Sequence, residues 1–259
     1  FCCENTIDRS FFMEEDILRL FYKGSEIILI GTSHISAESA DLVRKTIQEE
    51  NPDTICIEWD QKRYKKNIHP DEWDDTDVVK IIKNKQFPVF IFGVIYKLFQ
   101  KKVSQDMNSL VGKEFVVAVD ESKKLNIKFY LIDRDSSLTF KRAWRMLNFR
   151  EKVKLPYAFG KIFEGAEETE EEVQNLLESE NFEPVFEELK ESYPNLWEVF
   201  VTERDDYLAT KIQNTANGKT VAVLGKAHLK GVSDRLKNNQ KSDLQKLEII
   251  PPKKFGSKL

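Results

Sequence analysis

The sequence predicts an α/β fold in which a central, mostly parallel sheet is flanked by helices. The run Ile27–Ile30 is apolar and rich in β-branched residues without polar alternation, which is typical of a strand covered on both faces. An amphipathic stretch and a second apolar run, Thr54–Ile57, follow it. This order of strand, helix and strand is that of a parallel βαβ unit.

The segment between these two runs has the pattern of a surface helix. Ser36 can cap its first turn, and Ala40, Val43 and Ile47 recur at helical spacing among charged residues. Asn51-Pro52-Asp53 ends the pattern, because a residue before proline avoids helical geometry. We therefore expect one buried and one solvent-facing side on this helix.

Later segments extend the sheet. A helix from about Leu110 to Lys124 precedes a third predicted strand, Ile127–Ile132. A long amphipathic helix beginning at Leu196 precedes a fourth, Thr220–Leu224. We also expect a final edge strand within Lys246–Ile250.

The region from about Ser136 to Asn195 differs from the rest, with helical segments, few strand signals and the acidic run Glu164–Glu172. We interpret it as a helical insertion within a single domain that spans residues 1–259. Such an insertion is either a solvated structural layer or a lid that gates substrate or forms a dimer contact. A homo-oligomer is therefore one expectation.

Composition excludes several classes of protein. The chain has 259 residues, 41% hydrophobic and 32% charged, which fits a globular domain rather than a disordered one. A formal net charge of -4 lacks the basic excess of a nucleic-acid-binding protein. The longest apolar stretch, Phe87–Phe99, is too short to span a bilayer and predicts a core or interfacial helix, or an element lying on a membrane surface.

Cysteine usage and the end of the sequence bear on location. The chain has three cysteines, with Cys2 and Cys3 adjacent and Cys56 in a predicted strand, so they form no disulfide framework and indicate a reducing compartment. We expect a cytoplasmic protein, or one at the cytoplasmic face of a membrane. The residues from Pro251 have the character of a tail, and a membrane anchor could follow them in a longer protein.

Two strand ends share one arrangement: an apolar run, a glycine, two residues and a histidine. Gly31–His34 and Gly225–His228 both have it, in a chain with only three histidines. Glu58 follows another strand, and the carboxyl ends of parallel strands meet at one edge of a sheet. Two imidazoles and a carboxylate could hold a divalent metal ion, zinc or manganese, and leave one position open.

Other charged residues are candidates for the same crevice. Arg134 follows the third strand, and Arg142 and Arg145 could bring positive charge back from the insertion. Glu203, Arg204 and Tyr207 lie within one helical turn of each other. Two other interpretations remain open: the histidines are structural, or the glycine turns and arginines bind an anion or peptide without catalysis.

Six segments together resemble successive motifs of the TraB/PrgY pheromone-shutdown family, in the same order along about Glu26 to Gly231. They are GTSH (Gly31–His34), CIEWDQKRY (Cys56–Tyr64), LIDRD (Leu131–Asp135), RAW (Arg142–Trp144), ERDDYLA (Glu203–Ala209) and VLGKAH (Val223–His228). That family is grouped with the Tiki proteases, which share two Gly-x-x-His motifs, an early glutamate and an arginine. Many similar members carry transmembrane helices after the second histidine motif, and this sequence has none there.

The resemblance implies a metal-dependent hydrolase, with a peptide as substrate or ligand. His34, Glu58 and His228 would hold the metal ion, and Arg134 and Arg204 would lie near the substrate. We expect Glu58 or Glu203 to be the general base, and the two arginines to stabilise an oxyanion or hold a substrate carboxylate. Arg142, Arg145 and Tyr207 are expected to bind substrate. Lys226, inside the second motif, can point into the site or away from it.

Overall fold

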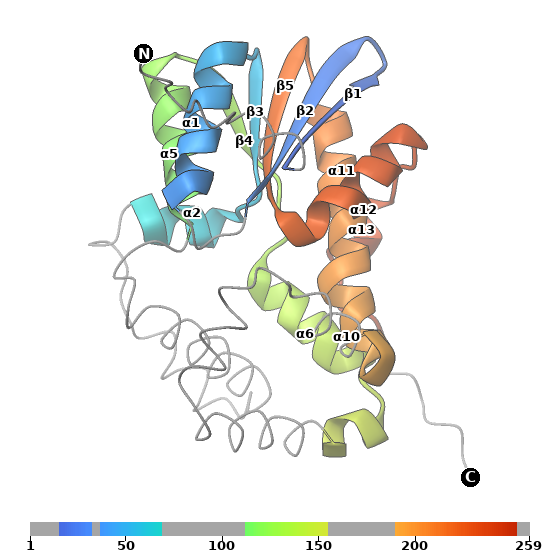
Figure 1. Cartoon of the computed structure of the whole chain (residues 1–259). Coiled ribbons are helices and arrows are strands. Elements are labelled where there is room, and N and C mark those ends of the chain that lie inside the picture. The colour runs from blue at the N-terminus through green and yellow to red at the C-terminus, as the bar shows by residue number, and fades with distance from the viewer. Residues whose placement is uncertain (1–15, 33–36, 69–111, 155–189, 253–259) are drawn as a thin grey trace, which may run out of the picture.

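The computed structural model describes residues 16–32, 37–68, 112–154 and 190–252. They form a five-stranded sheet with the order β1-β2-β5-β3-β4 (Figure 1). The strands are β1 (Ile17–Tyr22), β2 (Ser25–Thr32), β3 (Thr54–Ile57), β4 (Lys128–Leu131) and β5 (Lys219–Gly225). Only β1 runs antiparallel to its neighbour, so the mostly parallel α/β fold is confirmed.

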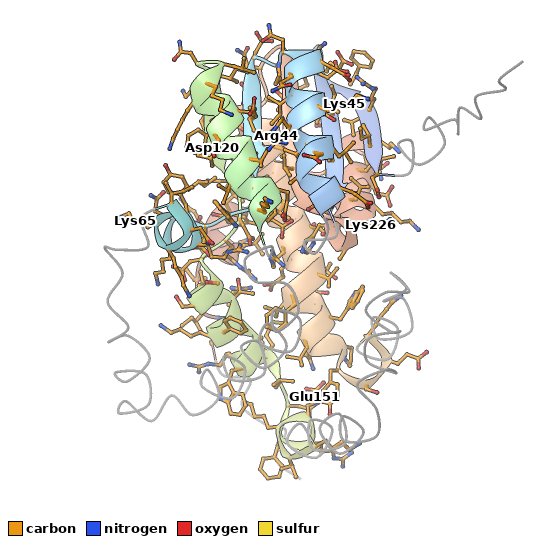
Figure 2. All side chains as sticks on the ribbon, turned by 60° about the vertical axis from the view of Figure 1, so that its left-hand side comes forward. Arg44, Lys45, Lys65, Asp120, Glu151 and Lys226 are labelled. Carbon is orange, nitrogen blue, oxygen red and sulfur yellow. The ribbon has the colours of Figure 1, made fainter. Side chains whose placement is uncertain are left out.

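Helices cover both faces of the sheet, as the unbroken apolar runs predict. Ile28 and Ile30 of β2 belong to the core beneath α1 (Ala37–Glu50) and α5 (Lys113–Lys124). Ile27 and Leu29 belong to the core on the opposite face, beneath α11 (Glu203–Thr215) and α12 (Lys226–Lys237). Figure 2 shows α1 and α5 side by side over the strands, where the Gln48 amide donates to Glu121 at 2.9 Å.

β1 is a strand that the sequence pattern does not predict. It pairs with β2 through a two-residue turn at Lys23 and Gly24, both with positive φ, which is the geometry of a tight hairpin. Leu20 and Tyr22 are buried in the core, whereas Phe21 is 78% exposed. Apolar residues also stand on the exposed face of this edge strand, so its sequence lacks the alternation of apolar and polar residues that would predict it.

Cys56 has the buried position expected for it. Its side chain lies within β3 with no exposed surface, and its Sγ is 3.3 Å from the Thr215 hydroxyl of α11. Burial raises the pKa of this thiol to about 11. The thiol therefore belongs to the core and not to the reactive groups of the molecule.

The remaining elements lie toward the carboxyl ends of the parallel strands. They are α2 (Gln61–Ile68), α6 (Ser136–Met146), α10 (Pro194–Trp197), the π-helical turn η2 (Glu198–Thr202) and α13 (Leu244–Leu247). α10, η2 and α11 follow without a break and form the long helix expected from Leu196. In Figure 1, α6 and α10 extend below the sheet, and Figure 2 places Glu151 at the far end of this extension.

The edge strand predicted within Lys246–Ile250 is wrong. Asp243 caps a short helix there by accepting from the backbone N–H groups of Gln245 and Lys246. The carbonyls of this segment then accept hydrogen bonds from buried arginines and not from a neighbouring strand. Apolar composition suggested a strand, but the local cap and two distant arginines decide the conformation.

Parts of two sequence predictions lie outside the described residues. These are the middle of the helical insertion, 155–189, and the apolar stretch 87–99. In the ranges that the structure describes, no helix is both long enough and apolar enough to cross a membrane. α6 and α10 lie at the two ends of the predicted insertion, where Ala143, Leu147, Leu196 and Val199 form a small core of their own.

Candidate functional site

Charged side chains converge where β3, β4 and β5 end. Glu58 directly follows β3, and its backbone N–H donates to the Val223 carbonyl of β5 at 3.1 Å. Its Oε2 accepts from the Gly225 N–H at 2.7 Å, and its side chain is buried. These two bonds fix Glu58 across the ends of two adjacent strands and leave Oε1 directed at the neighbouring charges.

Arg204 joins the two carboxylates at this edge. It enters from the first turn of α11, where its Nη2 lies 2.5 Å from Glu58 Oε1 and 2.8 Å from Asp133 Oδ2. Its Nε donates to Asp133 Oδ1 at 3.2 Å, so the pair with Asp133 is side-on and bidentate. Burial alone would lower the pKa of Arg204, but the charges of Asp133 and Glu58 outweigh burial and raise it.

His228 is held by both of its ring nitrogens. Its Nδ1 lies 2.6 Å from Asp205 Oδ1, and its Nε2 lies 2.8 Å from Arg204 Nη1. A guanidinium can only donate, so Nε2 must accept, and the ring proton therefore resides on Nδ1 and is donated to Asp205. This assigns one tautomer, in which the Nε2 lone pair is directed at Arg204 Nη1, and Glu58 Oε1 is 3.7 Å from the same nitrogen.

Asp133 and Arg63 complete the network. Arg63 of α2 contacts Asp133 through Nη2 and Asp60 through Nε, the latter at 3.1 Å. Burial alone would raise the pKa of Asp133, but Arg204 and Arg63 hold it well below its ordinary value. Asp60 also accepts from the N–H groups of Lys62 and Arg63 and so caps the start of α2.

A second buried cluster surrounds Glu203, one residue before Arg204. Arg142 of α6 forms a side-on, bidentate pair with its carboxylate, with Nε donating to Oε2 at 2.8 Å and Nη2 to Oε1 at 2.5 Å. Arg134 donates to the same carboxylate at 2.7 Å and to the Val199 and Leu247 carbonyls at 3.1 Å. Burial lowers the pKa of Arg134 despite this pairing. Through Leu247 and Lys246, the cluster connects α13 to α6 and α11.

Two glycines act through close approach and not through a tight turn. A Cβ at Gly31 would lie 2.9 Å from Leu229 of α12, and a Cβ at Gly231 would overlap the Asp205 carboxylate. Gly225, in contrast, has φ -64 and ψ 140, which other residues adopt readily. The glycines thus let α12 lie close to β2 and α11, which brings His228 to Asp205.

The structure brings together three of the residues expected at the site, Glu58, Arg204 and His228. Arg134, Arg142 and Glu203 lie in the neighbouring cluster, and the Tyr207 hydroxyl donates to Glu248 at 2.8 Å. Burial and the Glu248 contact raise the pKa of Tyr207. Arg145 lies in the last turn of α6. His34 lies outside the described residues.

Lys226, which could point either way, pairs with Asp16 at 3.0 Å, and 51% of its side chain is exposed (Figure 2). Asp16 precedes β1, and its carbonyl accepts from the Gly31 N–H. The first residue of α12 is therefore tied to the antiparallel edge of the sheet. His228, two residues later, is directed at α11.

Three residues of the network were not singled out from the sequence: Asp133, Asp205 and Arg63. Asp133 had a usable signal, because it directly precedes Arg134 at a strand's carboxyl end, where Glu58 was selected by the same criterion. Asp205 stands beside Arg204 in a run of four charged residues. The sequence of that run does not indicate which of its carboxylates binds the His228 imidazole of α12.

The chemistry of the donors bears on a metal ion. Glu58 Oε1 and His228 Nε2 are ligand atoms of the kind that zinc and manganese accept, and they are close to one another. Asp205 behind Nδ1 supplies the outer hydrogen bond typical of a metal-bound histidine. Within the described ranges, no group of three or more His, Cys, Asp or Glu side chains is arranged to hold a metal ion.

The sequence of this chain is similar to those of known proteins. The model of the TraB/PrgY/gumN family matches residues 17–245. An uncharacterized protein of Methanocaldococcus jannaschii is 32% identical over 234 residues, which cover 88% of this chain and 58% of that protein. TraB domain-containing proteins of Mus musculus and Homo sapiens are 26% and 27% identical, with 91% and 88% of this chain covered and 69% and 67% of theirs.

The family match begins at the first residue of β1 and ends within α13, so it includes all five strands of the described sheet and the charged network at their ends. The resemblance carried by the separate motifs is therefore continuous along the fold. The chain belongs to the TraB/PrgY/gumN family.

Proposed function

We propose that this chain is a hydrolase that cleaves a peptide or amide bond with the help of a divalent metal ion, zinc or manganese. The observation that carries the proposal is the series of contacts in which Asp205 binds His228 and His228 lies beside Glu58. Asp205 fixes the imidazole so that Nε2 presents a lone pair, and Glu58 Oε1 lies 3.7 Å from that nitrogen. Two ligand atoms of one ion lie at a similar separation when each is about 2.0–2.2 Å from it.

The described residues supply two donors of the kind that such an ion accepts. Glu58 and His228 would hold it, with His34 as the third ligand expected from the sequence. A bound divalent ion of this kind lowers the pKa of a water molecule toward neutrality and polarises a carbonyl. The chain's own contribution is orientation, since both donors are buried and each is fixed by a second hydrogen bond.

Arg204 supplies the positive charge of the proposed site. Its side-on pair with Asp133 fixes the guanidinium plane, which can stabilise an oxyanion or hold a substrate carboxylate. Glu203 and Glu58 are both proposed proton acceptors, and they differ in surroundings. Glu203 is bonded to Arg134 and Arg142, whereas Glu58 is a proposed metal ligand and can take the proton only if it does not hold the ion.

A peptide is the proposed substrate, and the proposed location is the cytoplasm or the cytoplasmic face of a membrane. A homo-oligomer and membrane association through a segment outside this sequence remain proposals of the same kind. The curated relatives are longer than the matched region, so activities of those whole proteins could require further segments.

A second candidate function is a regulator that binds a peptide or anion without cleaving it. The observation that favours it is the pairing of Arg204 with both proposed metal ligands, which leaves a closed network of charges. In this alternative, Glu58 and His228 position Arg204 for an anionic ligand.

Metal analysis with matched variants tests the proposed function. Protein purified without chelator, or reconstituted with zinc or manganese, should hold one ion per chain and cleave members of a peptide library. His228→Ala and Glu58→Gln should lose both properties. Glu248→Gln, which changes a carboxylate bonded to Tyr207 on α11, serves as control and should retain them. Absence of bound ion in every preparation would refute the hydrolase; bound ion without cleavage would favour the regulator.

A further inference from the structure

The guanidinium of Arg204 occupies the position between the two proposed metal ligands. Its Nη1 is 2.8 Å from His228 Nε2, and its Nη2 is 2.5 Å from Glu58 Oε1. These are the same two atoms that the proposed ion requires. A cation of the chain's own therefore already satisfies both donors.

The network needs this positive charge for its stability. Glu58 and Asp133 are both buried, and their oxygens approach the same Nη2 atom at 2.5 and 2.8 Å. Two carboxylates this close repel each other strongly when no cation lies between them. A buried charge without a partner is more costly still than an imperfect pair. Arg204 thus neutralises the site when no ion is bound.

The contacts of Arg204 divide into a fixed and a replaceable set. The Nε edge makes the bidentate pair with Asp133, which Arg63 also holds from the other side. Nη1 contacts His228, whereas Nη2 is shared between Glu58 and Asp133. Release of both donors therefore requires the guanidinium to move so that Nη2 keeps its contact with Asp133 and gives up Glu58.

We propose that Arg204 is the resident counterion of the metal-free site and competes with the metal ion for Glu58 and His228. This inference rests on the proposed function. It makes Arg204 the residue that sets metal affinity, because an ion must displace the guanidinium from both donors before it binds. A divalent ion can do so through its higher charge and shorter ligand distances, whereas a monovalent ion has neither advantage.

Calorimetric titration of metal-free protein with zinc, and separately with manganese, tests the competition. Arg204→Met removes the charge and keeps much of the side-chain volume, and we expect it to bind the ion at least about tenfold more tightly than wild type. Arg204→Lys keeps one positive charge beside Asp133 and should bind the ion with an intermediate affinity. It provides the test if the methionine variant folds poorly.

Arg235→Met is the matched control. Arg235 is a largely buried arginine of α12 whose contacts are with Asp205, Asp206 and the Thr202 and Gly231 carbonyls. Its substitution should lower the melting temperature of the metal-free protein while leaving metal affinity within about twofold of wild type, since it does not compete for the two donors. For Arg204→Met, added zinc should in addition restore the lost melting temperature.

The outcomes separate the two proposals. Tighter binding by the Arg204 variants, or binding by them alone, supports competition. Equal or weaker binding than wild type overturns it and leaves the proposed metal site standing. If neither wild type nor any Arg204 variant binds zinc or manganese while all remain folded, both the competition and the proposed function are wrong.

Discussion

His228 Nδ1 and Asp205 Oδ1 lie 2.6 Å apart, and this one contact sets which ring nitrogen of His228 carries the proton. The imidazole comes from α12 and the carboxylate from α11, so two helices on one face of the sheet must be in register for it to form. Arg204 donates to the other ring nitrogen and is therefore compatible only with this tautomer.

The variant Asp205→Asn should weaken this control. Its amide can turn a donor toward Nδ1, which would favour a proton on Nε2, where Arg204 Nη1 donates in the wild type, and would remove the lone pair that a metal ion needs. We expect affinity for zinc or manganese to fall by about 10–100-fold, the usual range for an outer partner of a metal-bound histidine. Calorimetry measures the affinity, and nitrogen chemical shifts of the His228 ring report the tautomer without any metal.

The control for this substitution is Asp206→Asn. Asp206 is the next residue of the same helix, and its carboxylate contacts Arg235 and Gln240. It should leave the His228 chemical shifts unchanged. Identical ring shifts in Asp205→Asn and wild type would show that Asp205 does not determine the tautomer.

Gly231→Ala should disturb the same pair from the side of α12. A Cβ there would overlap the Asp205 carboxylate, so either the carboxylate or the helix must move. We expect a loss of about 1–3 kcal/mol in the free energy of unfolding, as for other overpacked positions. Urea denaturation measures the loss.

A double-mutant cycle identifies the cause of that loss. In an Asp205→Ala background the obstructing carboxylate is gone, and Gly231→Ala should then be close to neutral, because alanine is the better helix former. An undiminished penalty in the double variant would place the strain elsewhere. Lys230→Ala, on an exposed position beside it, controls for changes in helix propensity.

Much of the fold is predictable because the central strands carry their own signal. β2, β3 and β5 are covered on both faces, which requires continuous apolar sequence, and the bounds of β3 agree with the prediction. β1 and the segment that contains the end of α13 are not predictable in this way. The conformation of β1 depends on pairing with β2, and that of Lys246–Ile249 depends on arginines more than 100 positions earlier in the chain.

The candidate site is predictable in part for a similar reason. Glu58 and His228 can be found because they follow apolar strands whose carboxyl ends share an edge. The difference between Glu203 and Arg204 cannot be read from sequence. They are adjacent on α11, yet one faces Arg134 and Arg142 and the other faces Glu58 and His228. Successive side chains on a helix point about 100° apart, so two adjacent residues face different surroundings.

Glu203→Gln tests whether this carboxylate acts mainly in stability. Arg134 and Arg142 are buried and would lose their shared negative partner, so we expect about 3–5 kcal/mol lower stability. Urea denaturation measures this directly. Glu198→Gln, on the preceding π turn, is the control. Burial and the Glu203 charge raise the pKa of Glu198, and its substitution should lower the free energy of unfolding by less than Glu203→Gln does. Full stability with lost cleavage would instead identify Glu203 as the general base.

Acid should weaken the network through Asp133. Because its pKa is below the ordinary value of 3.8 in the folded state, the unfolded chain binds its proton first as pH falls. The stability contributed by ionised Asp133 is therefore present above about pH 5 and decreases as pH falls through 3.8 toward the lower folded-state pKa. Asp133→Asn should cost about 3 kcal/mol at pH 6, and the difference from wild type should shrink below about pH 4.

Asp205 should have the opposite pH dependence, which makes it the internal comparison. Burial raises its pKa, despite the hydrogen bond from His228, so the folded chain keeps this proton to higher pH than the unfolded chain. Its contribution to stability is therefore fully present below the ordinary value of 3.8 and is lost as pH rises through the higher folded-state pKa. Urea midpoints measured from pH 6 to pH 3 should show the gap between wild type and Asp133→Asn narrowing with acid. A gap that stays constant over this range would mean that Arg204 and Arg63 do not hold Asp133 ionised.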